Sequence, residues 1–331
     1  MALIHVGLVG TGYAAQKRAD AFREDERSHL VGIYGTNPER VKHLCQTYDA
    51  RAFDSYHELI NHPDIHLVVI STQNHLHGAI AKAALEARKH VVVEYPLSLA
   101  LEEAMHLISL AAEQHVLLHI EHIELLSGIH HAVIEALPLI GTPFYAKSTS
   151  LRMESTVPDK WSYDPERVGF PLMAALSRIQ RLVAVFGKVV TVSCQSRFWT
   201  IEGTIHEHPT VTTPYQSCLC SAQLRFESGL IADLVYGKGT TIWNTERSLS
   251  IHGETGMIQL NGSHGQLIRA DGSQELTVGS RKGLFAKDSR MVLDALTKGT
   301  PMYVTPEQSL YALQVADAAR RSALMSSMIQ L

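Results

Sequence analysis

The chain has 331 residues, 45% of them hydrophobic and 19% charged, which is enough to bury a full core and to form about two domains. Lysine and arginine number 29 against 33 aspartate and glutamate residues, so the formal net charge of -4 excludes a basic surplus for nucleic acid. Four cysteines are too few for a disulfide scaffold, and the 19 histidines lack the company of other metal ligands. We expect a reduced, cytoplasmic monomer that binds no metal, no nucleic acid and no membrane.

The first part of the chain alternates apolar runs with helical patterns. Strand-like runs at residues 4–10, 29–35, 67–72 and 90–96 alternate with helices that begin at Tyr13, Asn37 and Asn74. A further helix at 100–114 and a strand at 116–125 complete the series. Because this alternation is typical of βαβ units on a parallel sheet, we predict an α/β Rossmann domain over residues 1–124 that binds NADP.

The character changes from about Phe144. Strand-like runs separated by glycine and polar turns follow at 145–153, 189–199, 218–227, 230–239, 247–254 and 256–260. Helical spacing returns at 288–296 and 306–324. These patterns predict an α+β domain over residues 125–331 with a large, mostly antiparallel, open-faced sheet, and the C-terminal helix is free to pack back on the first domain. We expect Phe198, Trp199 and Trp243 in the core of this sheet.

A glycine-rich turn lies between the first strand and the first helix. Gly10 and Gly12 allow a tight turn and let backbone N–H groups approach a pyrophosphate at the helix N-terminus. Ala15 stands in the third position of the motif, where a small residue lets helix and strand pack closely. We therefore predict that Gly10, Gly12, Tyr13 and Ala14 contact a dinucleotide.

The end of the second strand indicates which dinucleotide is bound. A strict NAD site places a carboxylate here for the ribose hydroxyl, but this chain has Gly35, followed by Thr36 and Asn37. Without the carboxylate a 2′-phosphate is not repelled, Thr36 and Asn37 can donate to it, and Arg40 can supply positive charge. We predict NADPH as the cofactor, with NADH weaker; the alternative for Arg40 is a solvated helix residue.

Three motifs in order, GTGYAA at 10–15, STQNHLH at 71–77 and EYP at 94–96, resemble the GFO/IDH/MocA oxidoreductase family. The resemblance implies a Rossmann domain followed by an open-faced antiparallel sheet. It also places Thr72, Asn74, His77 and Glu94 beside the cofactor. Asn74 fits equally well as a helix N-cap, which needs no ligand.

Sugar and polyol dehydrogenases of this family carry a lysine where this chain has Tyr95, and a histidine near the place of Ser177 and Arg178. Both groups handle the proton of a carbinol, so their loss disfavours an alcohol substrate. Segments 117–126, 169–179, 197–199 and 278–285 extend the resemblance to the biliverdin reductases, above all the cyanobacterial type. That resemblance implies transfer of a hydride from NADPH to the central methine carbon of biliverdin, giving bilirubin.

The same resemblance places Arg178 beside the substrate, where a guanidinium can pair with a propionate, stabilise negative charge and assist protonation of a pyrrole nitrogen. A structural pair with a neighbouring acid is the alternative. Arg181, one turn on, either shares this face or is solvated. Tyr95 offers a ring that stacks and a hydroxyl that donates, or it only packs.

Acidic residues and one histidine follow the strands at 90–96 and 116–125. Alternation along a strand would put His122 and Glu124 on one face and Glu121 on the other. We predict Arg178, Tyr95 and Glu94 as catalytic residues, and Tyr95, Glu121, His122 and Arg178 as contacts of the substrate, biliverdin. The alternatives are a sugar or imine oxidoreductase of the same family, or a non-catalytic NADP-sensing regulatory protein.

Overall fold

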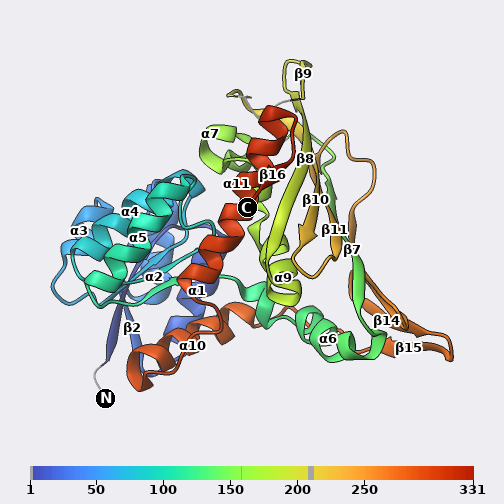
Figure 1. Ribbon diagram of the computed structural model, residues 1–331. Helices are drawn as coiled ribbons and strands as arrows, with labels where there is room; N and C mark the ends of the chain where they lie inside the picture. The colour runs from blue at the N-terminus through green and yellow to red at the C-terminus, as the bar shows by residue number, and fades with distance from the viewer. Residues whose placement is uncertain (1–2, 158, 208–211) are drawn as a thin grey trace. The chain divides into compact units, whose positions relative to one another are not determined.

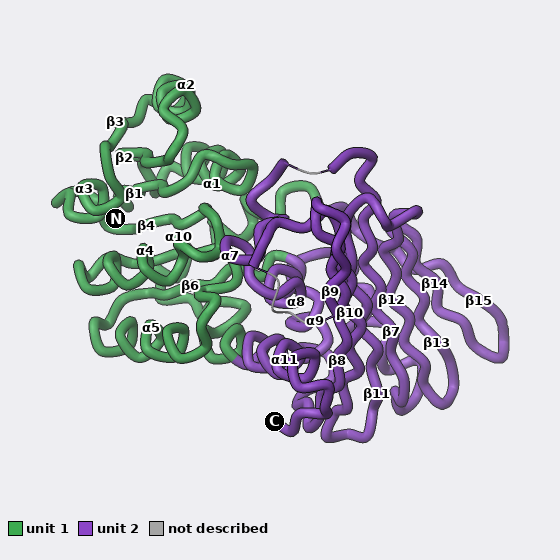
Figure 2. The backbone as a smooth tube through the Cα atoms, turned by 90° about the horizontal axis from the view of Figure 1, so that it is seen from above, with its two compact units in different colours: residues 1–123, 282–310 green, residues 124–281, 311–331 purple. Residues whose placement is uncertain are grey.

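The computed structural model describes residues 3–157, 159–207 and 212–331. Two compact units make up the chain (Figure 2): unit 1 contains residues 1–123 and 282–310, and unit 2 contains residues 124–281 and 311–331. The first boundary lies one residue before the predicted one. Residues 282–310, which we expected in the second domain, belong to unit 1, so two distant stretches of sequence form that unit.

Unit 1 is built on a six-stranded sheet of parallel strands in the order β3-β2-β1-β4-β5-β6. Its strands are β1 (Ile4–Val9), β2 (Ser28–Tyr34), β3 (Arg51–Ala52), β4 (Leu67–Ile70), β5 (His90–Val93) and β6 (Leu118–Ile120). All four residues of β4 are buried, as expected for a strand covered on both faces. The predicted parallel sheet is thereby confirmed.

Helices pack in two groups around this sheet (Figure 1). Helix α1 (Tyr13–Arg23) contacts α2 (Pro38–Tyr48) and α10 (Leu284–Lys298), whereas α4 (Asn74–Glu86) contacts α3 (Tyr56–Asn61) and α5 (Leu101–Glu113). Two such groups cover the two faces of a doubly wound sheet. The last helix, α11 (Pro306–Met325), begins in unit 1 and continues in unit 2.

The strand predicted at 116–125 is much shorter than expected. Strand β6 ends at Ile120, and a 3-10 turn, η1 (Ile123–Leu126), follows. Side chains replace the strand ladder here, because the Ile123 N–H donates to the Glu121 carboxylate and the His122 N–H donates to the Tyr303 hydroxyl at 3.1 Å. The predicted alternation of Glu121, His122 and Glu124 across a strand was therefore wrong.

Unit 2 contains a ten-stranded sheet whose main path runs β15-β14-β13-β12-β7-β11-β10-β8-β16, with β9 added on β8. The strands are β7 (Pro143–Met153), β8 (Val189–Thr200), β9 (Ile205–His206), β10 (Tyr215–Phe226), β11 (Ile231–Gly239), β12 (Glu246–Gly253), β13 (Gly256–Asn261), β14 (His264–Arg269), β15 (Gly272–Leu276) and β16 (Ile329–Gln330). Only β7 and β11 pair in parallel among the described strands of this sheet. The predicted mostly antiparallel sheet is confirmed.

The two faces of this sheet differ in exposure. Along β8, Cys194 and Ser196 are buried while Gln195 and Arg197 are exposed, so alternate residues define an inner and an outer face. Helix α8 (Pro171–Ala174) packs on β10 and β11, and a ring contact between Phe186 and Phe226 joins α9 (Leu176–Phe186) to β10. The remaining helical segments of unit 2 are α6 (Gly128–Ala136), η2 (Leu137–Ile140), η3 (Trp161–Tyr163) and α7 (Pro165–Val168).

Two local expectations differ from the structure. Phe198 is buried as predicted, but Trp199 is half-buried on the outer face and Trp243 is 88% exposed, so neither is a core residue. In the segment that follows Gly169, two helices, α8 and α9, meet at Ala175. Within the described residues, no helix has the length and apolar character needed to cross a membrane.

Candidate functional site

The glycine-rich turn has the backbone geometry that a pyrophosphate site requires. Gly10 has a φ of 127°, and a Cβ there would lie 2.1 Å from the carbonyl oxygen of Ser71, so only glycine fits. Gly12 is the N-cap of α1, and its side-chain position is open, with no atom within 4 Å. No side chain caps α1, so its first N–H groups have no side-chain acceptor and can donate to an anion.

The residues after Gly12 divide into packing and exposed positions. Ala15 is fully buried, as its place in the motif predicts. Tyr13 is 73% exposed, and its ring meets Phe285 edge-on at 6.3 Å. Ala14 is half-buried. The predicted contacts of Tyr13 and Ala14 with a dinucleotide stay predictions.

The turn after β2 explains why no carboxylate stands there. A Cβ on Gly35 would lie 2.6 Å from the Thr11 side chain, so any side chain at this position forces a shift. Asn37 is the N-cap of α2, and its Oδ1 accepts from the Arg40 N–H at 3.0 Å, which leaves its amide NH₂ group to donate. Thr36 and Arg40 are exposed, and Arg40 has no ion pair with any described residue. This set fits a 2′-phosphate.

His77 fixes the loop that follows β4. Its Nδ1 lies 2.8 Å from the Pro96 carbonyl oxygen and its Nε2 lies 3.4 Å from that of Thr72, with the ring 1% exposed. Burial lowers the pKa of His77, so the ring is neutral and its Nδ1–H donates to Pro96. Its contact with the cofactor stays a prediction, whereas its hydrogen bond to Pro96 of the EYP motif and its position beside Thr72 are observed.

Asn74 is not the N-cap that we considered. The N-cap position of α4 belongs to Gln73, and Asn74 is the first helical residue, with a buried side chain. Thr72 is half-buried and its hydroxyl donates to the Gln73 carbonyl oxygen at 3.3 Å. Both residues lie where β4 ends, the edge at which ligands bind in open parallel sheets.

Glu94 follows β5 directly and is held by buried charges. The Arg18 Nε donates to Glu94 at 3.1 Å, and Arg18 also forms an ion pair with Asp288 on α10. Asp288 further accepts from His119 at 2.8 Å and from the Tyr303 hydroxyl at 2.7 Å. Arg18 and Asp288 are fully buried, whereas the Glu94 side chain is 16% exposed. The Glu94 carboxylate is therefore held by buried partners, and a small part of its side chain stays exposed.

Glu121 is a second buried partner of Glu94. The two side chains are hydrogen-bonded, and burial together with the Glu94 charge raises the pKa of Glu121 well above its ordinary value. The raised pKa favours the protonated form of Glu121, which can donate in this contact. It is 2% exposed, so its predicted contact with substrate stays a prediction while its support of Glu94 is observed.

Tyr95 and His122, predicted separately, form a stacked pair. Their rings lie 5.4 Å apart and are inclined by 4°. The His122 Nε2 lies 2.8 Å from the Ser309 hydroxyl, and the ring is fully buried. Burial and the neighbouring His119 lower the pKa of His122 to about 3, so the ring is neutral. His122 forms the wall against which the half-buried Tyr95 stands.

Arg178 lies in unit 2, in the first turn of α9. Its Nη1 donates to the Ser177 hydroxyl at 3.3 Å, and it has no ion pair with any described residue. The acid-paired alternative for Arg178 therefore fails. Arg181 is the residue that pairs: it is buried and donates to Glu124 at 2.8 Å, so it is not solvated.

Sequence patterns did not reveal Arg18 or Asp288. Arg18 comes three residues after Ala15, on the buried side of α1, which is the only hint of its role. Asp288 is 270 residues away from Arg18, and no local pattern joins them.

No group of three or more His, Cys, Asp or Glu side chains among the described residues could hold a metal ion.

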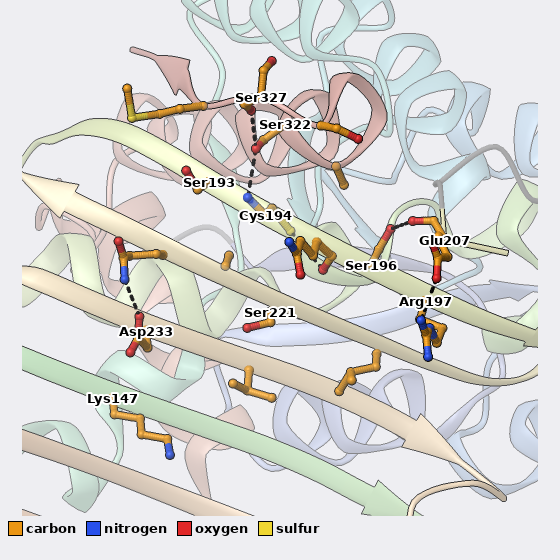
Figure 3. A pocket seen from close by; sticks show the side chains of 18 of the residues that line it. Lys147, Ser193, Cys194, Ser196, Arg197, Glu207, Ser221, Asp233, Ser322 and Ser327 are labelled. Atoms are coloured by element: carbon orange, nitrogen blue, oxygen red, sulfur yellow. Dashed lines mark hydrogen bonds and ion pairs between the residues drawn. The ribbon is translucent and has the colours of Figure 1, made fainter.

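A separate cavity of about 1080 Å³ lies on the outer face of the sheet in unit 2 (Figure 3). Strands β8, β10 and β11 line it with the end of α11, and an ion pair of 2.6 Å between Arg197 and Glu207 closes one side. The Ser322 hydroxyl accepts from the Cys194 N–H at 2.8 Å and donates to the Ser327 carbonyl oxygen at 2.6 Å. Because no predicted site residue lines this cavity, it is not the candidate site.

Several solved structures are similar to this chain, and two of them are compared with it. The biliverdin reductase of Synechocystis sp. PCC 6803, solved in complex with biliverdin and NADP+, is 46% identical, with a TM-score of 0.91 over 96% of this chain and 98% of that chain. The UDP-N-acetylglucosamine 3-dehydrogenase GnnA of Acidithiobacillus ferrooxidans is 20% identical, with a TM-score of 0.78 over 98% of this chain and 99% of that chain. That second similarity shows the fold alone.

Curated sequences lead to the same family. Biliverdin reductase A of Mus musculus is 24% identical over 96% of this chain and 95% of its own length. Residues 4–122 match the NAD-binding Rossmann fold of the GFO/IDH/MocA oxidoreductases, and residues 139–331 match their C-terminal alpha/beta domain. The chain therefore belongs to the GFO/IDH/MocA oxidoreductase family.

Proposed function

We propose that this chain is an NADPH-dependent biliverdin reductase, which reduces the central methine carbon of biliverdin and forms bilirubin. The observation that carries the proposal is the 46% identity, over 96% of the chain, to the Synechocystis enzyme in complex with biliverdin and NADP+. Tyr95 and Arg178 support it, because the family resemblance puts Tyr95 in place of the lysine of the sugar dehydrogenases and Arg178 near the place of their histidine.

The residues of unit 1 fit the cofactor. Gly10, Gly12 and the uncapped start of α1 would hold the pyrophosphate, and Thr36, Asn37 and Arg40 would hold the 2′-phosphate. When bound, NADPH supplies the hydride. A side chain at Gly35 would collide with Thr11, which disfavours a ribose-binding carboxylate at this position and so favours NADPH over NADH.

Tyr95 and Glu94 shape the reacting region rather than exchange protons with an alcohol. The stacked His122 ring keeps Tyr95 in one orientation, so its ring offers a flat surface to a flat tetrapyrrole. Glu94 is kept in place by its ion pair with Arg18 and by its hydrogen bond with Glu121. A site ordered before the substrate arrives loses little free energy in reorganisation.

Arg178 stabilises the negative charge that develops on the tetrapyrrole nitrogens. Its guanidinium lacks an acidic partner among the described residues, so its charge is available to the substrate. A guanidinium is not deprotonated in proteins, so it does not donate the proton by itself. It assists protonation of the pyrrole nitrogen by holding a propionate or a water molecule that delivers the proton.

The test is to incubate the purified protein with NADPH and biliverdin and to record the pigment spectrum. We expect biliverdin to be consumed with the formation of bilirubin and the oxidation of NADPH in equal amounts. Parallel incubations of NADP+ with sugars and polyols should leave the nicotinamide spectrum unchanged. Oxidation of a sugar without reduction of biliverdin would show a sugar dehydrogenase, and no turnover of either would show a non-catalytic protein.

A further inference from the structure

Unit 2 contains more positive charge near Glu124 than that carboxylate can balance. Glu124 is 5% exposed and accepts from Arg181 through one oxygen and from Arg281 through the other. Both of its oxygens are therefore already paired with arginine. Arg178 and Arg247 lie near enough for their charges to interact, and neither has an ion pair with a described residue.

The position of Arg281 is fixed by a close backbone contact. A Cβ on Gly128, at the start of α6, would lie 2.2 Å from the backbone nitrogen of Gly279, so the segment before Arg281 rests directly on α6. Arg281 uses one terminal nitrogen for Glu124, and its side chain is 46% exposed. A guanidinium has five N–H donors, so those remaining can bind a ligand. The nucleotide-binding motifs do not account for the residues at 278–285. The close contact between Gly128 and Gly279 gives this segment a structural role.

Strand register places Arg247 on the inner face of the sheet. Arg247 on β12 is opposite Ser150 on β7, and it alternates with Leu249 and Ile251, which are buried on that face. Arg152, two residues after Ser150, is its diagonal neighbour on the same face. Arg152 is already paired with Glu154. Burial and the charges of Arg178 and Arg281 lower the pKa of Arg247, and the charge of Glu124 opposes them.

We propose that Arg247 and Arg281 bind the two propionate carboxylates of the bilin, with Glu124 as the fixed counterion that holds Arg281 in place. This inference rests on the proposed function and adds the residues that make the site specific for a dicarboxylate. Two carboxylates would compensate the excess positive charge, and planar guanidinium groups can bind each of them through paired hydrogen bonds. Arg178 then remains available to the tetrapyrrole nitrogens.

The experiment titrates the protein with biliverdin, and separately with its dimethyl ester, without NADPH, and follows the bilin absorbance. We compare the wild type with Arg247→Gln, Arg281→Gln and the control Arg225→Gln, which changes an exposed arginine on the outer face of β10. Each of the first two variants should weaken biliverdin binding about tenfold or more and leave binding of the ester unchanged. The control should bind both as the wild type does.

The outcomes separate this inference from the proposed function. Wild-type affinity of Arg247→Gln and Arg281→Gln for biliverdin, or an equal loss for the acid and the ester, overturns the inference even if the enzyme turns over. The expected pattern without turnover supports the inference and overturns the reductase activity. No binding of either bilin by the wild type overturns both. If Arg281→Gln fails to fold, judged by circular dichroism, Arg247→Gln decides alone.

Discussion

Arg178 is the residue whose loss should affect catalysis most. We expect Arg178→Ala to lower kcat on the order of 10²-fold, because a fixed cation is favoured more strongly in the transition state than in the ground state. Arg178→Lys should not restore activity, since an ammonium group cannot reproduce the planar fork. The affinity for NADPH should stay near that of the wild type in both variants. A near-normal kcat in the alanine variant would leave Arg178 a structural residue.

Tyr95 should act through its ring more than through its hydroxyl. We expect Tyr95→Phe to keep substantial activity, because phenylalanine preserves the stack on His122. Tyr95→Ala should lose more, since it removes the flat surface. Steady-state kcat and KM for biliverdin measure both effects. A loss of about 10²–10⁴-fold in the phenylalanine variant would instead identify the hydroxyl as a general acid.

At this scale, the sequence predicts residues whose roles come from local motifs. The turn from Gly10 to Ala15 was predictable because its chemistry lies within six residues. The partner of Arg181 was not, because Glu124 is 57 residues away and only the fold joins them. The burial of His122, and hence its low pKa, likewise depends on Ser309 and Tyr303, which are far along the chain.

The turn between β2 and α2 should determine the choice of coenzyme. Arg40→Ala should raise KM for NADPH more than KM for NADH, because it removes one charge-assisted contact with phosphate, worth on the order of 1.5–3 kcal/mol. The exposed neighbour Lys42 provides a matched control, since Lys42→Ala removes a charge from the same helix. If NADH is the better coenzyme of the wild type, our interpretation of this turn is wrong.

At the scale of elements, hydrophobic periodicity predicts the presence of a strand or helix more reliably than it predicts where that element ends. The strands and helices predicted for unit 1 occur in the predicted order because each is a self-contained apolar pattern, whereas β3 and α3 were not predicted. Strand β6 ends early because the Glu121 side chain bonds to the Ile123 N–H, a local competition that hydrophobic periodicity does not reveal.

For the whole molecule, the buried pair of Arg18 and Asp288 joins the two stretches of sequence that make unit 1. We expect Asp288→Asn to lower the free energy of unfolding by about 3–5 kcal/mol, because it removes the fully buried carboxylate that balances Arg18 and leaves only the partly exposed Glu94 as its partner. Asp294→Asn, on the same helix but at the surface, is the control and should change it far less. Chemical denaturation of both variants measures this.

The same carboxylate makes stability depend on acid. Burial raises the pKa of Asp288, but the charges of Arg18 and His119 outweigh it and hold the pKa well below the ordinary 3.8. The unfolded chain therefore takes up this proton first, and stability falls as the pH drops below about 4. In Asp288→Asn this part of the acid sensitivity should be missing. Equal acid sensitivity in both proteins would contradict this role.

The contribution of residues 282–310 to unit 1 was not predictable from the sequence. The helical pattern at 288–296 fits either domain. The sequence of an amphipathic helix shows which of its faces is buried, but it does not show on which domain that face packs. Asp288 decides this through Arg18 and His119, and such long-range pairs become visible only in the folded chain.

The central claim is the reduction of the central methine carbon of biliverdin with hydride from NADPH, and isotope transfer tests it most directly. The protein is incubated with biliverdin and NADPH that carries deuterium at the transferable position, and the bilin product is analysed by mass spectrometry and proton NMR. We predict bilirubin with one deuterium, located at the central methylene carbon. A product without deuterium, or with deuterium at another carbon, would contradict the account.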